Sequence, residues 1–123
     1  MIQAYSQDIT VSAMQAIPFN FVSAKKGCTA TQASPTNFEL HKSGVYEVCC
    51  GVSAAAAETI QLYKDGVAVP EARRTGTSPS FTTLVRADIE GSCGCCAVPA
   101  VLQVMAEDAA TLADASIVIT KLC

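Results

Sequence analysis

The sequence predicts an all-β fold, an antiparallel sandwich of eight or nine strands, and three observations support this prediction. Apolar and polar residues alternate over several short stretches, most clearly over 45–53 and 80–89, as they do in strands with one buried face. Gly and Pro residues fall at intervals between these stretches, which is typical of all-β chains. Asp65-Gly66 separates two such stretches, and this pair favours a tight hairpin turn.

The elements follow from these signals in order along the chain. We expect strands over residues 8–13, 17–22, 38–41, 45–53, 59–64, 67–69, 80–89, 98–105 and 116–122. Residues 28–37 and 70–79 are predicted to be loops, and 107–113 could be a helical turn or an open loop. Within 45–53, the two-residue period places Tyr46, Val48, Cys50 and Val52 on one face. The other face then carries Val45, Glu47 and Cys49.

Composition indicates one domain over residues 1–123 with more apolar surface than a lone sandwich hides. Hydrophobic residues make up 50% of the chain and charged residues 15%, whereas about 25% charged is usual. Burial against identical subunits is one explanation, and a large core is the other. Val101, Met105 and Val118 lie in strands that are apolar on both faces, so we expect them at a subunit interface; central strands with mixed outer faces are the alternative.

Two further segments have predicted roles in such an assembly. The first, residues 1–12, is expected to dock on a larger particle. The second is a polar loop that includes Arg73, Arg74 and Thr77, which is expected to face outward.

Charge and hydropathy argue against several classes of partner. The formal net charge is −3, and the eight Lys and Arg residues are scattered along the chain, which argues against nucleic-acid binding. No run of 18 apolar residues is present, so no membrane span is expected. The first residues do not form a basic region followed by an apolar run, so we expect no signal peptide and synthesis in a cytoplasm.

Seven cysteines are many for this length, and three interpretations stay open. Disulfide bonds could form after exposure to oxidant, among Cys28, Cys49, Cys50, Cys93, Cys95, Cys96 and Cys123. The segment with Cys93, Cys95 and Cys96 could bind a soft metal, although paired Cys-x-x-Cys knuckles are absent. The thiols could also stay reduced and pack as small apolar groups. Cys49 and Cys50 are adjacent on a strand and point to opposite faces, which argues against a bond between them.

The sequence contains no constellation typical of catalysis or cofactor binding. His41 is the only histidine and has no triad-type partner in the sequence. Glu90, Glu107 and Asp108 are interpreted as solvated loop charges rather than a glycosidase pair. Neither Gly44 nor Gly66 belongs to a phosphate-binding loop. We therefore predict a non-enzymatic protein without a cofactor.

Two motifs resemble the tumour-necrosis-factor and complement globular-head jelly rolls. Gly44-Val-Tyr46, preceded by Phe38 and Leu40, is similar to a strand signature of that family, and 60–66 is similar to its Asn/Asp-Gly hairpin. The closing strand over 117–120 matches the position of the family's final strand. The resemblance covers residue 38 to the end and implies a homotrimeric jelly roll. The chain lacks the collagen-like Gly-x-y stalk found in related spore-surface proteins.

The chain also resembles, over almost its whole length, short proteins of phages and prophages of Gram-positive gut bacteria. The shared stretches are 1–7, 17–20, 26–30, the region of Gly44, a cysteine cluster near residue 95 and a final Thr-Lys-x-Cys. This resemblance implies a virion structural protein. A capsid decoration or head-fibre protein, bound to the major capsid protein or another virion protein, is the function that it favours.

Two other functions compete with this one. A surface adhesin would bind a host glycan or protein through the outward loop, with Tyr63 as the best residue for stacking on a sugar. A disulfide-linked fibre subunit of a bacterial spore or cell surface would form ladders on a gel that collapse with reductant.

Overall fold

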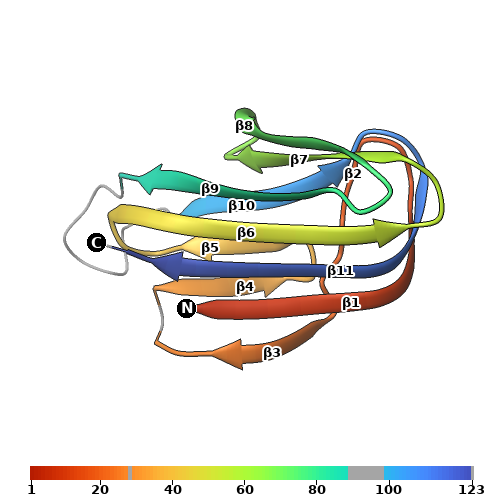
Figure 1. Ribbon diagram of the computed structural model, residues 1–123. Helices are drawn as coiled ribbons and strands as arrows, with labels where there is room; N and C mark the ends of the chain where they lie inside the picture. The colour runs from red at the N-terminus through yellow and green to blue at the C-terminus, as the bar shows by residue number, and fades with distance from the viewer. Residues whose placement is uncertain (28, 89–98, 123) are drawn as a thin grey trace.

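Two antiparallel β-sheets lie face to face in the computed structural model, which describes residues 1–27, 29–88 and 99–122 (Figure 1). Sheet A has the order β3-β1-β11-β6-β9, and sheet B has the order β4-β5-β10-β7-β8, with β2 paired to β10. The strands of sheet A are β3 (Phe21–Lys25), β1 (Ile2–Val11), β11 (Ala110–Lys121), β6 (Gly44–Ala54) and β9 (Ser80–Ala87). Those of sheet B are β4 (Ala30–Ser34), β5 (Asn37–Leu40), β10 (Ala100–Ala106), β7 (Glu58–Lys64), β8 (Val67–Gly76) and β2 (Gln15–Ala16).

The core lies between the sheets and follows the predicted alternation. In β6, the face with Tyr46, Val48, Cys50 and Val52 is buried, which confirms the assignment of that face. Sheet B contributes Phe38, Leu62 and Leu102 from the opposite side. Full burial of each large apolar side chain is worth about 1.5–3 kcal/mol. No helix in the described part of the chain is long and apolar enough to cross a membrane.

The predicted hairpin at Asp65-Gly66 is confirmed. Both residues have positive φ, 50° and 81°, which is the backbone conformation that a type I′ turn requires. The Asp65 carboxylate also accepts a hydrogen bond from the Val101 amide at 2.9 Å, and the Asp65 amide donates to the Val101 carbonyl at 2.8 Å. Two hydrogen bonds therefore connect the turn between β7 and β8 to the start of β10.

The predicted loop over 70–79 is wrong, because strand β8 continues to Gly76. The strand contains a wide bulge in which residues 69–72 lie opposite Leu62 alone. Pro70 fits in this bulge because it needs no ladder hydrogen bond there. The buried Gln61 side-chain amide donates to the Val69 carbonyl at 2.5 Å and to the Ala72 carbonyl at 3.3 Å. A single polar side chain thus satisfies the backbone of the bulge.

The first forty residues also differ from the prediction. Strand β1 begins at Ile2 rather than residue 8 and lies between β3 and β11, with Ile2, Ala4 and Val11 buried. Residues 17–20 cross between the sheets, where the Phe19 amide donates to the Pro35 carbonyl at 2.7 Å. The predicted loop over 28–37 contains β4 and the start of β5. The docking role of residues 1–12 stays a prediction, and these residues are built into sheet A.

There are eleven strands in the described residues, more than the eight or nine predicted. The two strands that were not predicted are short, since β2 has two residues and β4 has five. Polar residues dominate these segments, so their alternation is weak in the sequence.

Candidate functional site

The outer face of sheet A, the face directed away from sheet B, carries small and apolar side chains. Strand register places these residues side by side across the sheet: Gln3, Tyr5, Glu47, Cys49, Gly51, Ser80, Thr82, Leu84, Ser116 and Val118. Gly51 pairs with both Ser116 and Ser80, so one row of the face has little side-chain bulk. Val118 is half-buried between Gln3 and Cys49. The middle of the face therefore carries short side chains of weak polarity.

Exposed apolar groups lie at both edges of this face. Tyr5 and Phe21 stack with ring centroids 5.3 Å apart, and they are 37% and 54% exposed. Leu84, on the edge strand β9, is 56% exposed. Two unlike apolar patches, one aromatic and one aliphatic, thus flank the row of small residues.

The two adjacent cysteines of β6 are free thiols that point to opposite faces. Cys49 lies on the outer face of sheet A, where its thiol donates to Glu47 Oε1 at 3.6 Å and accepts from Thr82 Oγ1 at 3.5 Å. Cys50 lies in the core, and burial, with a smaller contribution from Cys49, raises the pKa of its thiol to about 12. Cys50 is therefore a neutral, unreactive thiol at physiological pH.

The other cysteines with predicted roles lie outside the described residues. They are Cys28, Cys93, Cys95, Cys96 and Cys123. Their predicted disulfide, metal-bound or reduced states stay predictions. Within residues 1–27, 29–88 and 99–122, no three or more His, Cys, Asp or Glu side chains are grouped to hold a metal ion.

Val101 and Met105 lie on the outer face of sheet B, on the opposite side of the sandwich from Val118. Both are half-buried, and the neighbouring strands place Glu39 beside Val101 and Gln61 beside Met105. The three residues predicted to form one interface are thus divided between the two outer faces.

Polar side chains on the outer face of sheet B are satisfied by one another. Gln103 donates to Asn37, and Thr59 and Thr75 share a hydrogen bond of 2.7 Å. Tyr63, the candidate for sugar stacking, is half-buried on this face beside Gln103.

Arg73 and Glu107 form an ion pair across the same face. The Arg73 Nε and Nη2 atoms donate to the two Glu107 carboxylate oxygens, each at 2.9 Å. This hydrogen bonding raises the pKa of Arg73 and lowers the pKa of Glu107. Arg73 and Arg74 are exposed, but they belong to strand β8 rather than to a loop, and their outward orientation in an assembly stays a prediction. Thr77 is exposed in the turn that follows β8.

His41 has a local structural role. Its Nε2 atom lies 2.7 Å from Thr31 Oγ1 and 4.0 Å from Glu39 Oε1. These contacts join the ends of β4 and β5. The Thr31 hydroxyl and the Glu39 carboxylate both approach the same ring nitrogen, whereas the acid of a catalytic triad binds the nitrogen opposite the nucleophile.

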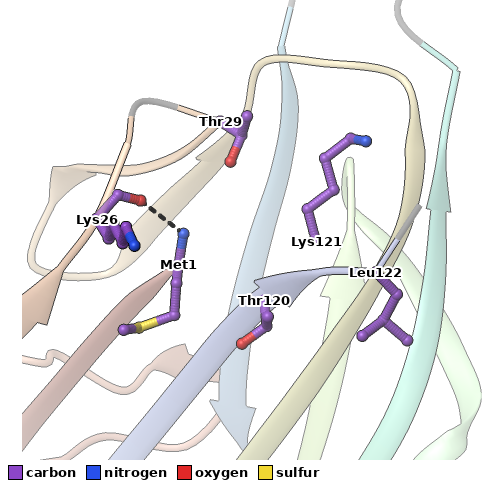
Figure 2. A pocket seen from close by; sticks show the side chains of 6 residues that line it. All are labelled: Met1, Lys26, Thr29, Thr120, Lys121 and Leu122. Carbon is purple, nitrogen blue, oxygen red and sulfur yellow. Dashed lines mark hydrogen bonds between the residues drawn. The ribbon is translucent and has the colours of Figure 1, made fainter.

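A pocket opens at the end of the sandwich where Met1 and Leu122 lie (Figure 2). It measures about 260 Å³ and is lined by Met1, Lys26, Thr29, Thr120, Lys121 and Leu122. Figure 2 shows Met1 and Lys26 on one side of the pocket, Lys121 and Leu122 on the other, and the two threonines between them. The Met1 amine donates to the Lys26 carbonyl at 2.9 Å, and the Lys26 amide donates back to Met1 at 2.8 Å.

Sequence reasoning missed both the aromatic pair and this pocket. Tyr5 alternates with the buried Ala4 and Ser6, so an aromatic residue at a polar position of a strand was the available signal. The pocket had no such signal, because Lys26 and Lys121 are far apart in the chain and line the same pocket only through the pairing of β3, β1 and β11.

No protein-family model and no curated protein sequence matches this chain. Solved structures do match it over nearly its whole length. The globular domain of the zebrafish complement 1qA protein has a TM-score of 0.78 at 10% identity, covering 99% of this chain and 96% of that one. Murine APRIL has a TM-score of 0.69 at 11% identity, with 98% of each chain covered. Rabbit GITRL has a TM-score of 0.60 at 13% identity, covering 100% of this chain and 95% of that one.

These identities are too low to carry a function across, and they show the fold alone. The predicted fold class is confirmed: the chain is an antiparallel jelly roll of the tumour-necrosis-factor and complement-globular-head type.

Proposed function

We propose that the protein is a non-enzymatic structural subunit of a phage virion that assembles as a homotrimer, as a capsid decoration or head-fibre protein. The observation that carries the assembly is the outer face of sheet A. Exposed Tyr5, Phe21 and Leu84 flank a row of small residues there, and exposed apolar patches of this kind mark interaction sites.

Two unlike patches at opposite edges favour a heterologous contact. The aromatic patch of one copy would pack against the Leu84 edge of the next, and heterologous contacts generate rings when the rotation closes. The match to complement and tumour-necrosis-factor folds supports three copies in such a ring. The virion location is supported by the resemblance to short phage and prophage proteins.

Sedimentation equilibrium of the full chain tests the assembly. We expect a mass of three times the 12.8 kDa chain at micromolar concentration. A monodisperse monomer would contradict the assembly and would leave the aromatic pair free, as an adhesin requires.

Mass spectrometry of purified virions, from the phage or prophage that encodes the protein, tests the location. We expect the protein in the particles at a fixed ratio to the major capsid protein. Its presence in the lysate but not in the particles would exclude a virion subunit. Running the sample with and without reductant would also report the cysteine state.

A further inference from the structure

The pocket beside Met1 and Leu122 has the chemistry of an anion site. Its lining includes two side-chain ammonium groups, from Lys26 and Lys121, and two threonines, Thr29 and Thr120, and no Asp or Glu among the described residues lines it. Ammonium and hydroxyl groups donate hydrogen bonds, and phosphate and carboxylate oxygens accept them.

The two lysines of the pocket have no ion-pair partner in the part of the chain that the structure describes. The ion pairs formed within the described residues are His41–Glu39, Arg73–Glu107 and Arg86–Asp88. Lys121 is nevertheless half-buried. A cation that is partly removed from water without a partner gains from a bound anion.

Backbone hydrogen bonds hold the walls of the pocket in place. Besides the two bonds between Met1 and Lys26, the Leu122 amide donates to the Val45 carbonyl at 2.7 Å. The Thr29 carbonyl accepts from the His41 amide at 2.8 Å. These bonds fix the backbone positions from which the donor side chains extend, so a ligand does not have to order the backbone.

The distribution of charge adds to this local arrangement. Six of the eight Lys and Arg residues lie at this end of the strands, namely Lys25, Lys26, Lys42, Lys64, Arg86 and Lys121. Glu39, Asp65 and Asp88 lie at the same end, so cations outnumber carboxylates there among the described residues, although the chain as a whole carries −3. Such an excess attracts anions. A second pocket, beside the β7–β8 turn, includes Asp65 and Glu71 among its lining residues and does not share this chemistry.

We propose that the pocket formed by Lys26, Thr29, Thr120 and Lys121 binds an oxyanion, the phosphate or carboxylate group of a small ligand. The two lysines bind the charged oxygens, and the threonine hydroxyls donate to the remaining lone pairs. The Met1 and Leu122 side chains leave an apolar wall beside this group. That wall accepts an alkyl substituent if the natural ligand carries one.

The test is a nuclear magnetic resonance titration of the full chain with inorganic phosphate and with butyl phosphate, at constant ionic strength held by NaCl. We expect saturable shifts at the Lys26, Thr29, Thr120 and Lys121 amides. Tighter binding of butyl phosphate identifies an anion with an apolar substituent, and tighter binding of inorganic phosphate identifies the free ion.

Variants distinguish binding in the pocket from a general attraction of anions to the positive charge at this end of the strands. Lys121→Gln is expected to weaken binding about tenfold, the loss of one charge-assisted hydrogen bond, and Lys121→Arg to retain it. Lys42→Gln removes the same charge at the same end without touching the pocket, so it should change the affinity by less than about twofold, because exposed charges are screened.

Two results would overturn the proposal. One is the absence of saturable shifts with either probe, and the other is an equal loss of affinity in Lys42→Gln and Lys121→Gln. The oligomeric state, measured on the same samples, reports separately on the proposed trimer, since the pocket is formed within a single chain.

Discussion

The two outer faces of the sandwich differ in whether the side chains they expose are mainly paired polar groups or apolar groups. On sheet B, Gln103 bonds to Asn37 and Arg73 to Glu107, so the polar side chains satisfy one another. On sheet A, the Tyr5–Phe21 pair and Leu84 are exposed. The named polar side chains of the first surface are paired within a single chain, whereas the second surface would bury exposed apolar groups if another subunit covered it. A subunit interface is therefore expected on sheet A.

The largest effect is expected from charge placed on the outer face of sheet A. Val118→Asp should abolish the trimer at micromolar concentration, because an interface would then bury an unpaired carboxylate. Val101→Asp is the matched control on sheet B and should leave the trimer intact. Both changes carry a similar strand-propensity cost, about 1 kcal/mol at most. Sedimentation equilibrium measures both, and dissociation of the Val101 variant alone would reverse our assignment of the faces.

The two thiols of β6 allow the core, which holds Cys50, to be compared with the outer face, which holds Cys49. The pKa of Cys50 is raised to about 12 from 9.0, so the folded protein keeps this proton to a higher pH than the unfolded chain does. The stability linked to this difference is fully present below pH 9. This contribution is lost as the pH rises from 9 toward 12, by about 1.4 kcal/mol per pH unit. Denaturant unfolding at pH 8 to 11 should show the loss in the wild type, and Cys50→Ala should remove this part of the pH dependence.

Alkylation at pH 8 reports on the other thiol. Cys49 should react faster in wild-type protein diluted until the trimer dissociates than in the assembled trimer, and Cys50 should stay unmodified in both. Equal rates for Cys49 in the two samples would mean that the outer face of sheet A is not covered by assembly.

A smaller effect is expected at the bulge of sheet B. Gln61→Leu should lower the free energy of unfolding by about 1–3 kcal/mol, because it leaves carbonyls of the bulge without a donor. The trimer should persist, since the change lies on the face that is complete without a partner. Chemical denaturation and sedimentation together check this, and loss of the trimer would mean that sheet B takes part in assembly.

The smallest effect is expected at the Arg73–Glu107 pair, because an exposed ion pair contributes little. The pKa of Glu107 is lowered by Arg73, so the contribution is present at neutral pH and is lost as the pH falls through that pKa. Arg73→Gln should abolish this acid dependence and leave the trimer unchanged. In 1 M NaCl, where screening acts within about 3 Å, the variant and the wild type should become indistinguishable in thermal unfolding.

Alternation and turn residues were sufficient to predict β6, β7, β9 and β10, whereas β1 and β11 begin several residues earlier than predicted. The faces of β6 and the hairpin at Asp65-Gly66 follow directly from the sequence. Strand β8 did not, because Pro70, Arg73 and Arg74 give it the composition of a loop. Its pairing depends on a bulge that Gln61 stabilises from another strand, and such tertiary contacts have no local signature.

The candidate sites were harder to predict than the strands. Val118 and Val101 look equivalent in the sequence, and only the topology assigns them to opposite outer faces. Lys26 and Lys121 belong to one pocket because β3 and β11 both flank β1. Which distant residues meet depends on strand order, and periodicity within a segment carries no information about strand order.

The position of β11 has a consequence for how the chain folds. This last strand lies between β1 and β6, so Ile2 pairs with Ile119. Contacts between residues so far apart in the sequence give a high contact order, which is associated with slow folding. During synthesis on the ribosome, β1 and β6 each keep one unpaired edge until β11 emerges, so sheet A closes only after β11 has been translated.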